Sequence, residues 1–183
     1  MINIQNNFLT PDVYKKVENY CYQADYYYGE WDNPNQVPTG VIHNLKLDSE
    51  IVSYFPNKIN DLSLYRAYIN LFNAGENPNF HIDGEGFTSL LYINTEDYRL
   101  DQGGFTEILT DQQHLVSVLP IRNSLVTFDA KAIHRATSFR SYPRFTVALK
   151  YGIKSDVKER KLADGQAQKP EGRTNGSRKS EVQ

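Results

Sequence analysis

The stretch Asn79-Phe80-His81-Ile82-Asp83-Gly84 lies near the middle of the chain, among short runs of apolar and aromatic residues. If this stretch is a β-strand, side chains two positions apart point to the same face. The His81 imidazole and the Asp83 carboxylate then project together, as two ligands for one metal ion. The sequence therefore predicts a metal site here, with a third ligand supplied from elsewhere in the chain.

The candidate for the third ligand is His134, which ends the stretch Phe128-Asp129-Ala130-Lys131-Ala132-Ile133-His134. Two histidines and one carboxylate on one face of a metal, with the other positions open, form the facial triad of non-haem Fe(II) oxygenases. Further along, Arg144 opens an apolar run over residues 144–151. An arginine near such a metal can hold a carboxylate of a dicarboxylic co-substrate through paired hydrogen bonds.

Strand-like segments separated by turns fill the chain from residue 63 to residue 152. We expect strands over residues 64–72, 79–83, 87–94, 105–109, 114–119, 124–128 and 144–151, and an opening strand within 2–8. Short strands at this spacing are typical of an all-β sandwich or barrel. A lone His-x-Asp is a weak signal, but here it stands in a fixed order with strands, a Gly-Gly turn, His134 and Arg144, which makes the pattern specific.

Two short helices are expected before most of the strands. Thr10-Pro11-Asp12 is typical of a helix start, with Thr10 at the N-cap and Pro11 at the first helical position. The residues that recur at helical spacing, and are expected on the buried side, are Val13, Val17, Tyr20 and Cys21. A second helix is expected after Asp48-Ser49-Glu50, ended or kinked by Pro56.

Length and composition place limits on the class of protein. The chain has 183 residues and a formal net charge of −2, which fits one domain with a sizeable core. No apolar run approaches the roughly 20 residues that span a membrane, and no signal pattern opens the chain, so we expect no membrane association. The single cysteine, Cys21, cannot form an internal disulfide, which favours a cytoplasmic setting.

The composition changes near residue 153. Residues 154–183 contain almost no large apolar side chain and are rich in Lys, Glu, Gly, Gln and Ser. Such a segment buries too little surface to offset the entropy of ordering. We therefore expect a domain over 1–152, with its helical support at the N-terminal end, and a polar, disordered tail over 153–183.

Residues 64–152 resemble the Fe(II)/2-oxoglutarate-dependent dioxygenases, and specifically their prolyl 4-hydroxylase-like branch. The resemblance rests on His81-Ile82-Asp83, Leu91-Tyr92-Ile93-Asn94, Gly103-Gly104, Val126-Thr127-Phe128, His134 and Arg144. Residues 66–70 and 145–150 also resemble hydroxylases encoded by marine phages and bacteria. The resemblance implies a double-stranded β-helix, a distorted, cupin-like jelly roll with supporting helices. It also implies a bacterial protein, or a phage-encoded protein in a bacterial host.

The same resemblance implies the cofactors of the site. His81, Asp83 and His134 would bind Fe(II), with 2-oxoglutarate as co-substrate, O2 as oxidant and ascorbate as a candidate reductant. Arg144 would pair with the distal carboxylate of 2-oxoglutarate. Tyr92 would donate a hydrogen bond to that carboxylate.

Three further residues are candidates for contact with 2-oxoglutarate. Thr146 is two residues past Arg144 and therefore on the same face of its strand. The relatives usually carry a tyrosine where this chain has Phe72, which lacks a hydroxyl. Asn70 and Tyr68, on the same face of that expected strand, are candidates to replace it.

The resemblance favours a prolyl residue in a peptide or protein as the substrate, hydroxylated with release of succinate and CO2. The turn-rich segment 26–40 is a candidate for gripping the substrate, with Trp31 as a stacking surface and Arg122 or Arg135 near the mouth. The fold alone does not fix the substrate, so a free amino acid, another side chain or an alkylated nucleobase are alternatives. A non-catalytic binding module with a structural metal is a third interpretation. We expect no nucleic-acid partner.

Overall fold

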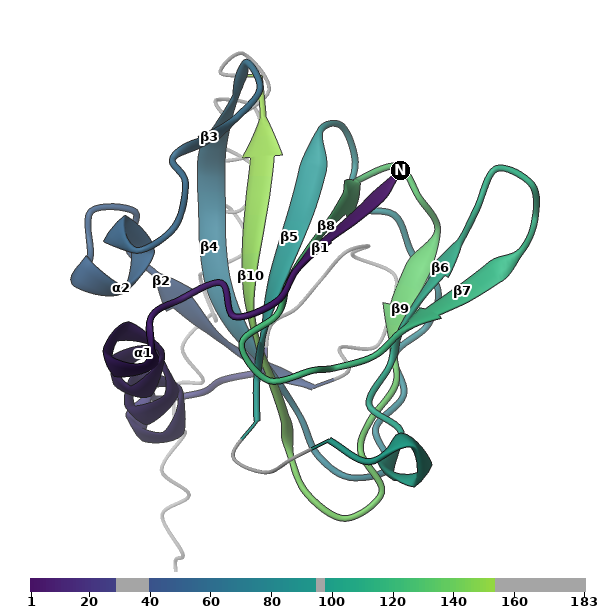
Figure 1. Cartoon of the computed structure of the whole chain (residues 1–183), viewed down its shortest axis with the longest axis horizontal. Helices are drawn as coiled ribbons and strands as arrows, with labels where there is room; N and C mark the ends of the chain where they lie inside the picture. Colours follow the sequence, from purple (N-terminus) through teal and green to yellow (C-terminus); the bar gives the residue numbers. More distant parts are fainter. Residues whose placement is uncertain (29–39, 95–97, 154–183) are drawn as a thin grey trace, which may run out of the picture.

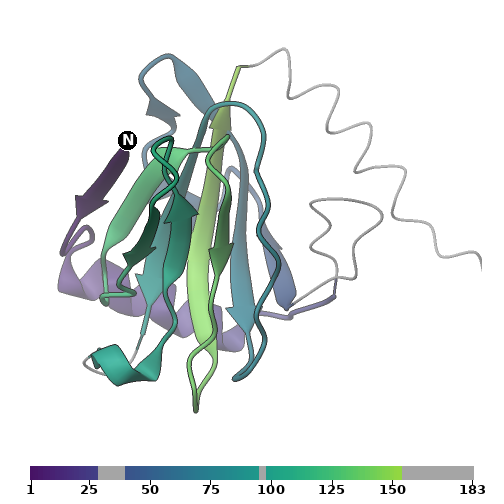
Figure 2. The ribbon, with the colours of Figure 1, turned by 90° about the vertical axis from the view of Figure 1, so that its right-hand side faces the viewer.

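The structure is a computed structural model that describes residues 1–28, 40–94 and 98–153. Its elements are β1 (Ile2–Gln5), α1 (Pro11–Gln23), β2 (Val41–Leu45), α2 (Glu50–Ser53), β3 (Lys58–Ile59), β4 (Leu62–Phe72), β5 (Phe87–Ile93), a 3-10 helix (Leu100–Gln102), β6 (Thr106–Leu109), β7 (Leu115–Val118), β8 (Leu125–Asp129), β9 (His134–Ala136) and β10 (Arg144–Gly152). The strands form two antiparallel sheets (Figure 1 and Figure 2). The predicted mainly-β class is confirmed.

The two sheets differ in size. The larger sheet has the order β1-β8-β5-β10-β4-β2, with β3 paired to β4, and the smaller sheet has the order β7-β6-β9. Apolar side chains of both sheets, among them Tyr92 and Val126 of the larger sheet and Ile108 and Val118 of the smaller one, meet in one buried cluster. The inner faces of the two sheets therefore pack against each other.

Strand β10 lies at the centre of the larger sheet, between β4 and β5. All nine of its residues are buried. Val147 and Leu149 belong to the core on the helix side, whereas Ala148 belongs to the core between the sheets. Because strand side chains alternate between faces, every second residue from Arg144 onward points between the sheets.

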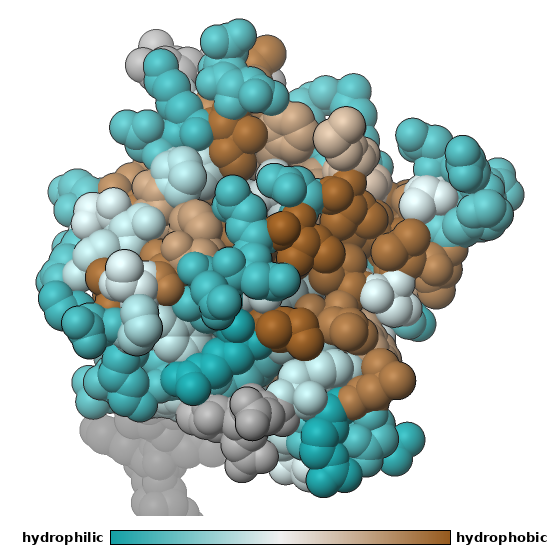
Figure 3. All heavy atoms as spheres, in the orientation of Figure 1, coloured by the Kyte–Doolittle hydropathy of each residue, from teal (hydrophilic) through white to brown (hydrophobic). Residues whose placement is uncertain are grey.

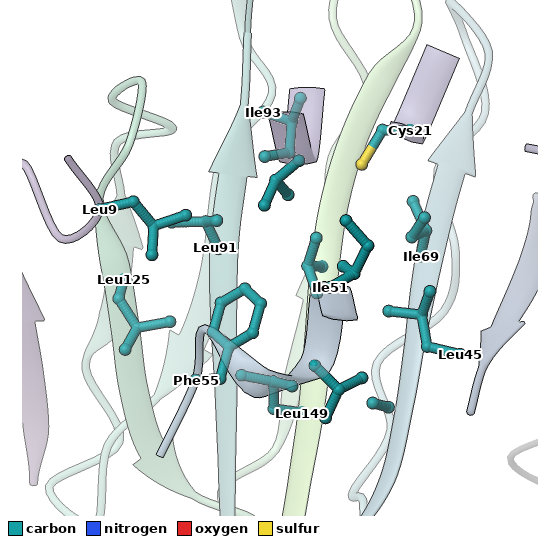
Figure 4. Close-up of a cluster of buried hydrophobic side chains, with 14 of the residues drawn as sticks. Leu9, Cys21, Leu45, Ile51, Phe55, Ile69, Leu91, Ile93, Leu125 and Leu149 are labelled. Atoms are coloured by element: carbon teal, nitrogen blue, oxygen red, sulfur yellow. The ribbon is translucent and has the colours of Figure 1, made fainter. Parts of the chain in front are cut away.

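The helix-side core joins α1 and α2 to the outer face of the larger sheet (Figure 4). Cys21 of α1 and Ile51 of α2 pack there with Leu91 of β5 and Leu149 of β10. Burial is the main cause that raises the pKa of the Cys21 thiol to about 12. Cys21 is therefore a core residue, as its position in the helical pattern predicts.

Helix α1 begins as predicted, with Pro11 at its first position after Thr10. Its buried face differs from the prediction, because Tyr20 is exposed while Tyr14 and Glu18 are buried. Glu18 can be buried because Lys15 Nζ lies 2.6 Å and Arg122 Nη2 lies 3.3 Å from its carboxylate oxygens. A hydropathy pattern does not reveal such a paired charge.

Two expectations about strands need correction. Residues 79–83 were predicted as a strand, but the structure shows only an isolated β-bridge between His81 and His134. In addition, β2, β3 and β9 were not among the expected strands. β2 pairs with β4 along the edge of the larger sheet, from Val41 opposite Leu71 to Leu45 opposite Ala67.

Part of the prediction lies outside the described residues. This applies to Trp31, to residues 29–39 of the proposed gripping segment and to the predicted tail beyond residue 153. Within the described ranges, no helix has the length and apolar character that crossing a membrane requires.

Candidate metal centre

The structure brings the three predicted ligands together. One ligand atom from each of His81, Asp83 and His134 lies within 4.8 Å of the other two. Paired backbone hydrogen bonds fix this meeting, since His81 N donates to His134 O and His134 N donates to His81 O, both at 2.9 Å. Asp83 N also donates to Ala130 O at 2.9 Å. Two segments far apart in the sequence are thus aligned by their main chains.

Both histidines present the same ring nitrogen to the centre of the cluster. His81 Nδ1 lies 3.0 Å from Asn79 O, and His134 Nδ1 lies 2.8 Å from Ala132 O. A nitrogen that faces a carbonyl carries the proton, so Nε2 of each ring keeps its lone pair. The Nε2 atoms lie 3.8 Å (His81) and 3.3 Å (His134) from carboxylate oxygens of Asp83. This donor set fits a divalent metal with imidazole and carboxylate ligands.

The side chain of the carboxylate ligand, Asp83, is almost fully buried, and two further side chains hold it. Thr88 Oγ1 donates to Asp83 Oδ2, and the Lys150 ammonium forms an ion pair with the same oxygen. Burial by itself would raise the pKa of Asp83, but the charge of Lys150 outweighs it and holds this pKa well below its usual range. Asp83 is therefore an ionised ligand at neutral pH.

Arg144 is completely buried at the other end of the inner face of β10. Its Nε donates to Gly104 O at 3.0 Å and its Nη2 donates to Thr106 Oγ1 at 2.9 Å. Tyr92 Oη donates to the same Thr106 oxygen at 2.7 Å. These bonds fix the plane of the guanidinium. In this structure the Tyr92 proton goes to Thr106, and its predicted contact with a co-substrate carboxylate stays a prediction.

Gly104 allows Arg144 this position. It has φ of +78°, and a Cβ added there would lie 2.3 Å from the Phe139 ring. Only glycine combines this backbone conformation with the close ring. The Gly103-Gly104 turn of the sequence pattern thus serves to place a carbonyl against the guanidinium.

Between Arg144 and the metal ligands, three polar side chains lie in one row across three strands. Asn70 of β4 is directly opposite Thr146 of β10, which is directly opposite Tyr92 of β5. Asn70 Oδ1 and Thr146 Oγ1 are buried and have no hydrogen-bond partner among the described residues. Buried polar atoms are normally bonded to protein, water or ligand. A hydroxyl and an amide in this row fit a carboxylate-rich ligand.

Tyr68 lies in the next row of the same inner face. The Arg66 guanidinium carbon is 4.3 Å from the centre of its ring, and Lys150 Nζ is 5.7 Å from it. The ring therefore lies beside the cations near the metal ligands. Phe72, where the resemblance implies a tyrosine, is opposite Arg144 in the strand register.

The predicted substrate residues are not all near the cluster. Arg135 follows His134 but points to the opposite face of β9, where its Nε lies 2.7 Å from Glu107 and its guanidinium carbon 4.3 Å from the centre of the Phe80 ring. Arg122 pairs with Glu18 of α1 and covers the Tyr14 ring at 4.7 Å, on the helix side of the larger sheet. The structure therefore does not bring Arg122 or Arg135 to the metal ligands.

Three residues of the site, Thr88, Thr106 and Lys150, were not predicted from the sequence. A signal for Lys150 was present, since it is the fourth residue of the alternating series that starts at Arg144 and includes Thr146. Thr88 and Thr106 carry no comparable signal, because threonine is common in strands.

No protein-family model matches the sequence, and no curated protein matches it significantly. Solved structures do. A prolyl-4-hydroxylase from Pseudomonas putida has 14% sequence identity and a TM-score of 0.70, over 84% of this chain and 92% of that one. A prolyl hydroxylase from Trichoplax adhaerens, in complex with a peptide fragment of the hypoxia inducible factor oxygen degradation domain, has 20% identity and a TM-score of 0.65, over 88% and 86%. HygX from Streptomyces hygroscopicus, with nickel, 2-oxoglutarate and hygromycin B bound, has 11% identity and a TM-score of 0.59, over 84% and 83%.

These similarities establish the fold. The chain has the double-stranded β-helix of the 2-oxoglutarate and Fe(II) oxygenases, with prolyl hydroxylases among its structural neighbours. The predicted fold class is therefore confirmed.

Proposed function

We propose that this protein is an Fe(II)- and 2-oxoglutarate-dependent dioxygenase that hydroxylates a prolyl residue in a peptide or protein. The observation that carries the proposal is the convergence of His81, Asp83 and His134, with both Nε2 atoms directed at one ionised carboxylate. Such a triad leaves metal positions open for a co-substrate and O2. When bound, the metal and 2-oxoglutarate supply oxidative decarboxylation of the co-substrate coupled to oxygen insertion into a C–H bond.

The chain's own residues would bind and orient the co-substrate. Arg144, held by Gly104 O and Thr106, offers a fixed guanidinium to the distal carboxylate. The Thr146 hydroxyl can donate to the same ligand, and so can the Asn70 amide nitrogen after rotation of the amide. Apolar side chains of both sheets surround this row and exclude water, which strengthens each charged contact.

A peptide substrate is supported by the structural neighbours. The Pseudomonas putida protein is a prolyl-4-hydroxylase, and the Trichoplax adhaerens prolyl hydroxylase is seen with a peptide fragment bound. HygX, with hygromycin B bound, supports the second candidate, the same chemistry on a small molecule.

The substrate class can be tested directly. The enzyme is incubated with Fe(II), 2-oxoglutarate, ascorbate and air, together with a set of proline-containing peptides or a bacterial proteome. We expect succinate release stimulated by a proline-containing substrate, and a gain of one oxygen atom on proline by mass spectrometry. Release without a proline peptide, but with a free amino acid or another small molecule, would move the assignment to the second candidate. No release with any substrate, from protein that binds metal, would contradict the oxygenase proposal.

A further inference from the structure

We propose that Lys150 sets the charge of the metal centre, so that the site binds a divalent metal less tightly and an anionic co-substrate more tightly than the three ligands alone would. The inference rests on the proposed function and names a positioning residue for it. Lys150 is 6% exposed and lies on the inner face of β10, in the alternating series that begins at Arg144.

The contacts of Lys150 are directed at one ligand. Its Nζ forms an ion pair with Asp83 Oδ2 and lies 3.3 Å from Thr88 Oγ1, which donates to the same oxygen. Both groups therefore engage Oδ2 of the metal-binding carboxylate.

The charges at the centre show what Lys150 changes. The histidines are neutral when they bind a metal, so the ligand set alone carries the single negative charge of Asp83. With Lys150 included, the protein groups sum to zero, and a divalent metal raises the centre to two positive charges instead of one. A dianionic co-substrate, whose distal carboxylate pairs with Arg144, then meets a centre that is one charge more positive than it would be without Lys150. Because both charges are buried, water screens this difference only weakly.

Lys150 should therefore have opposite effects on the two binding steps. Its positive charge opposes the metal and competes for Asp83, whereas it favours the anion that binds afterwards. A side chain that merely filled space or satisfied Asp83 would support both steps in the same direction. The sign of the two changes distinguishes the roles.

The test uses the complete chain with Co(II) as the metal probe and 2-oxoglutarate as the anion probe. Co(II) affinity is measured by the visible absorption of the bound ion, and 2-oxoglutarate affinity for the Co(II) protein by calorimetry. We expect Lys150→Met to bind Co(II) about tenfold more tightly and 2-oxoglutarate about tenfold more weakly. Lys150→Gln should show the same signs, because it removes the charge but keeps a hydrogen-bond donor. Lys150→Arg should restore values near those of the wild type.

A matched control removes the same charge elsewhere. The control variant is Lys16→Met. Lys16 lies on α1, where its side chain is 63% exposed and pairs with Glu50. It should leave both affinities unchanged. If both neutral variants at position 150 weaken Co(II) and 2-oxoglutarate binding together, or change neither, the role of Lys150 is overturned while the metal site stands. If the wild type binds no Co(II), or His134→Ala binds it equally well, the proposed function itself is overturned.

Discussion

Asn70 and Thr146 lie directly opposite each other across β4 and β10, and each carries a buried polar atom without a partner among the described residues. Leaving a buried polar group unsatisfied costs about 1–3 kcal/mol. Two such groups side by side, between Arg144 and the metal ligands, indicate a place where a polar ligand completes the structure.

Thr146→Val should separate stability from binding. The valine has nearly the same shape but no hydroxyl, so we expect unchanged or slightly higher thermal stability of the ligand-free protein and about tenfold weaker 2-oxoglutarate binding. The matched control is Thr127→Val, on the outer face of the larger sheet, where Thr127 Oγ1 and Ser89 Oγ are 2.7 Å apart. The control should lose about 1 kcal/mol of stability and keep its affinity. Equal 2-oxoglutarate affinities in wild type and Thr146→Val would remove Thr146 from the binding site.

His134→Ala should abolish binding of Fe(II) or Co(II) and nearly preserve the fold. The bonds that align the ligand segments are main-chain bonds of residues 81 and 134, which the substitution leaves in place. Metal titration and thermal unfolding measure the two effects. His43→Ala is the control, because His43 bonds to Tyr20 and to Asp25 O away from the cluster. Metal binding retained by His134→Ala would exclude His134 from the ligand set.

Arg144→Lys and Arg144→Met should rank the contributions of charge and geometry. Lysine keeps the charge but lacks the planar fork that reaches Gly104 O and Thr106 together. We expect 2-oxoglutarate affinity to fall about tenfold in the lysine variant and at least a hundredfold in the methionine variant. The affinity is measured on the Co(II)-loaded protein. If the wild type and both variants bound 2-oxoglutarate with similar affinity, a residue other than Arg144 would hold its distal carboxylate.

Thr106→Val should weaken both stability and co-substrate binding. Thr106 Oγ1 accepts from Arg144 and from Tyr92, so its loss leaves two buried donors without their acceptor. We expect a loss of about 2–3 kcal/mol in the free energy of unfolding, measured by denaturant titration. Thr106→Ser keeps the oxygen and should recover most of this loss. If Thr106→Val bound 2-oxoglutarate as tightly as the wild type does, Arg144 would need no fixed partner.

Tyr14 predicts a pH dependence of stability at the alkaline end. Tyr14 Oη donates to Asn94 O at 3.1 Å and accepts from Asn94 N at 3.0 Å, and burial is the main cause that raises its pKa to about 12. In the unfolded chain a tyrosine has a pKa of about 10. The folded state therefore holds the proton more tightly. The stability that Tyr14 contributes is complete below about pH 10 and is lost as the pH rises to about 12.

Tyr14→Phe measures this contribution. Unfolding free energies of wild type and variant, both free of metal, are compared between pH 8 and pH 12. We expect the wild type to lose its advantage over the variant across the upper part of this range, because the other titrating groups, including Cys21, are common to both proteins. Parallel curves would contradict the pKa shift.

Much of the fold follows from sequence pattern alone. The pattern of apolar residues and turns identified seven of the strands, and Thr10 with Pro11 identified the start of α1. The alternation of side chains in a strand placed Tyr68 and Asn70 on one face of their strand, and Thr146 on the same face as Arg144. These signals are local, because they depend only on backbone geometry within a few residues.

The tertiary structure decided which local elements meet. It aligned residues 79–83 with His134 through a single β-bridge, and it moved Arg122 to the helix side by pairing it with Glu18. It also placed Lys150 against Asp83, which joins a strand end to a distant loop. The sequence by itself determined the identity of the three metal ligands and of Arg144, and the face that Thr146 shares with Arg144. Which partner each one reaches depends on strand order and loop path, and these are fixed only when the two sheets pack together. Figure 3 shows hydrophobic residues gathered over β1 and the β6–β7 hairpin. The sequence gives the hydropathy of each of these residues, but only the tertiary structure brings them together on one surface.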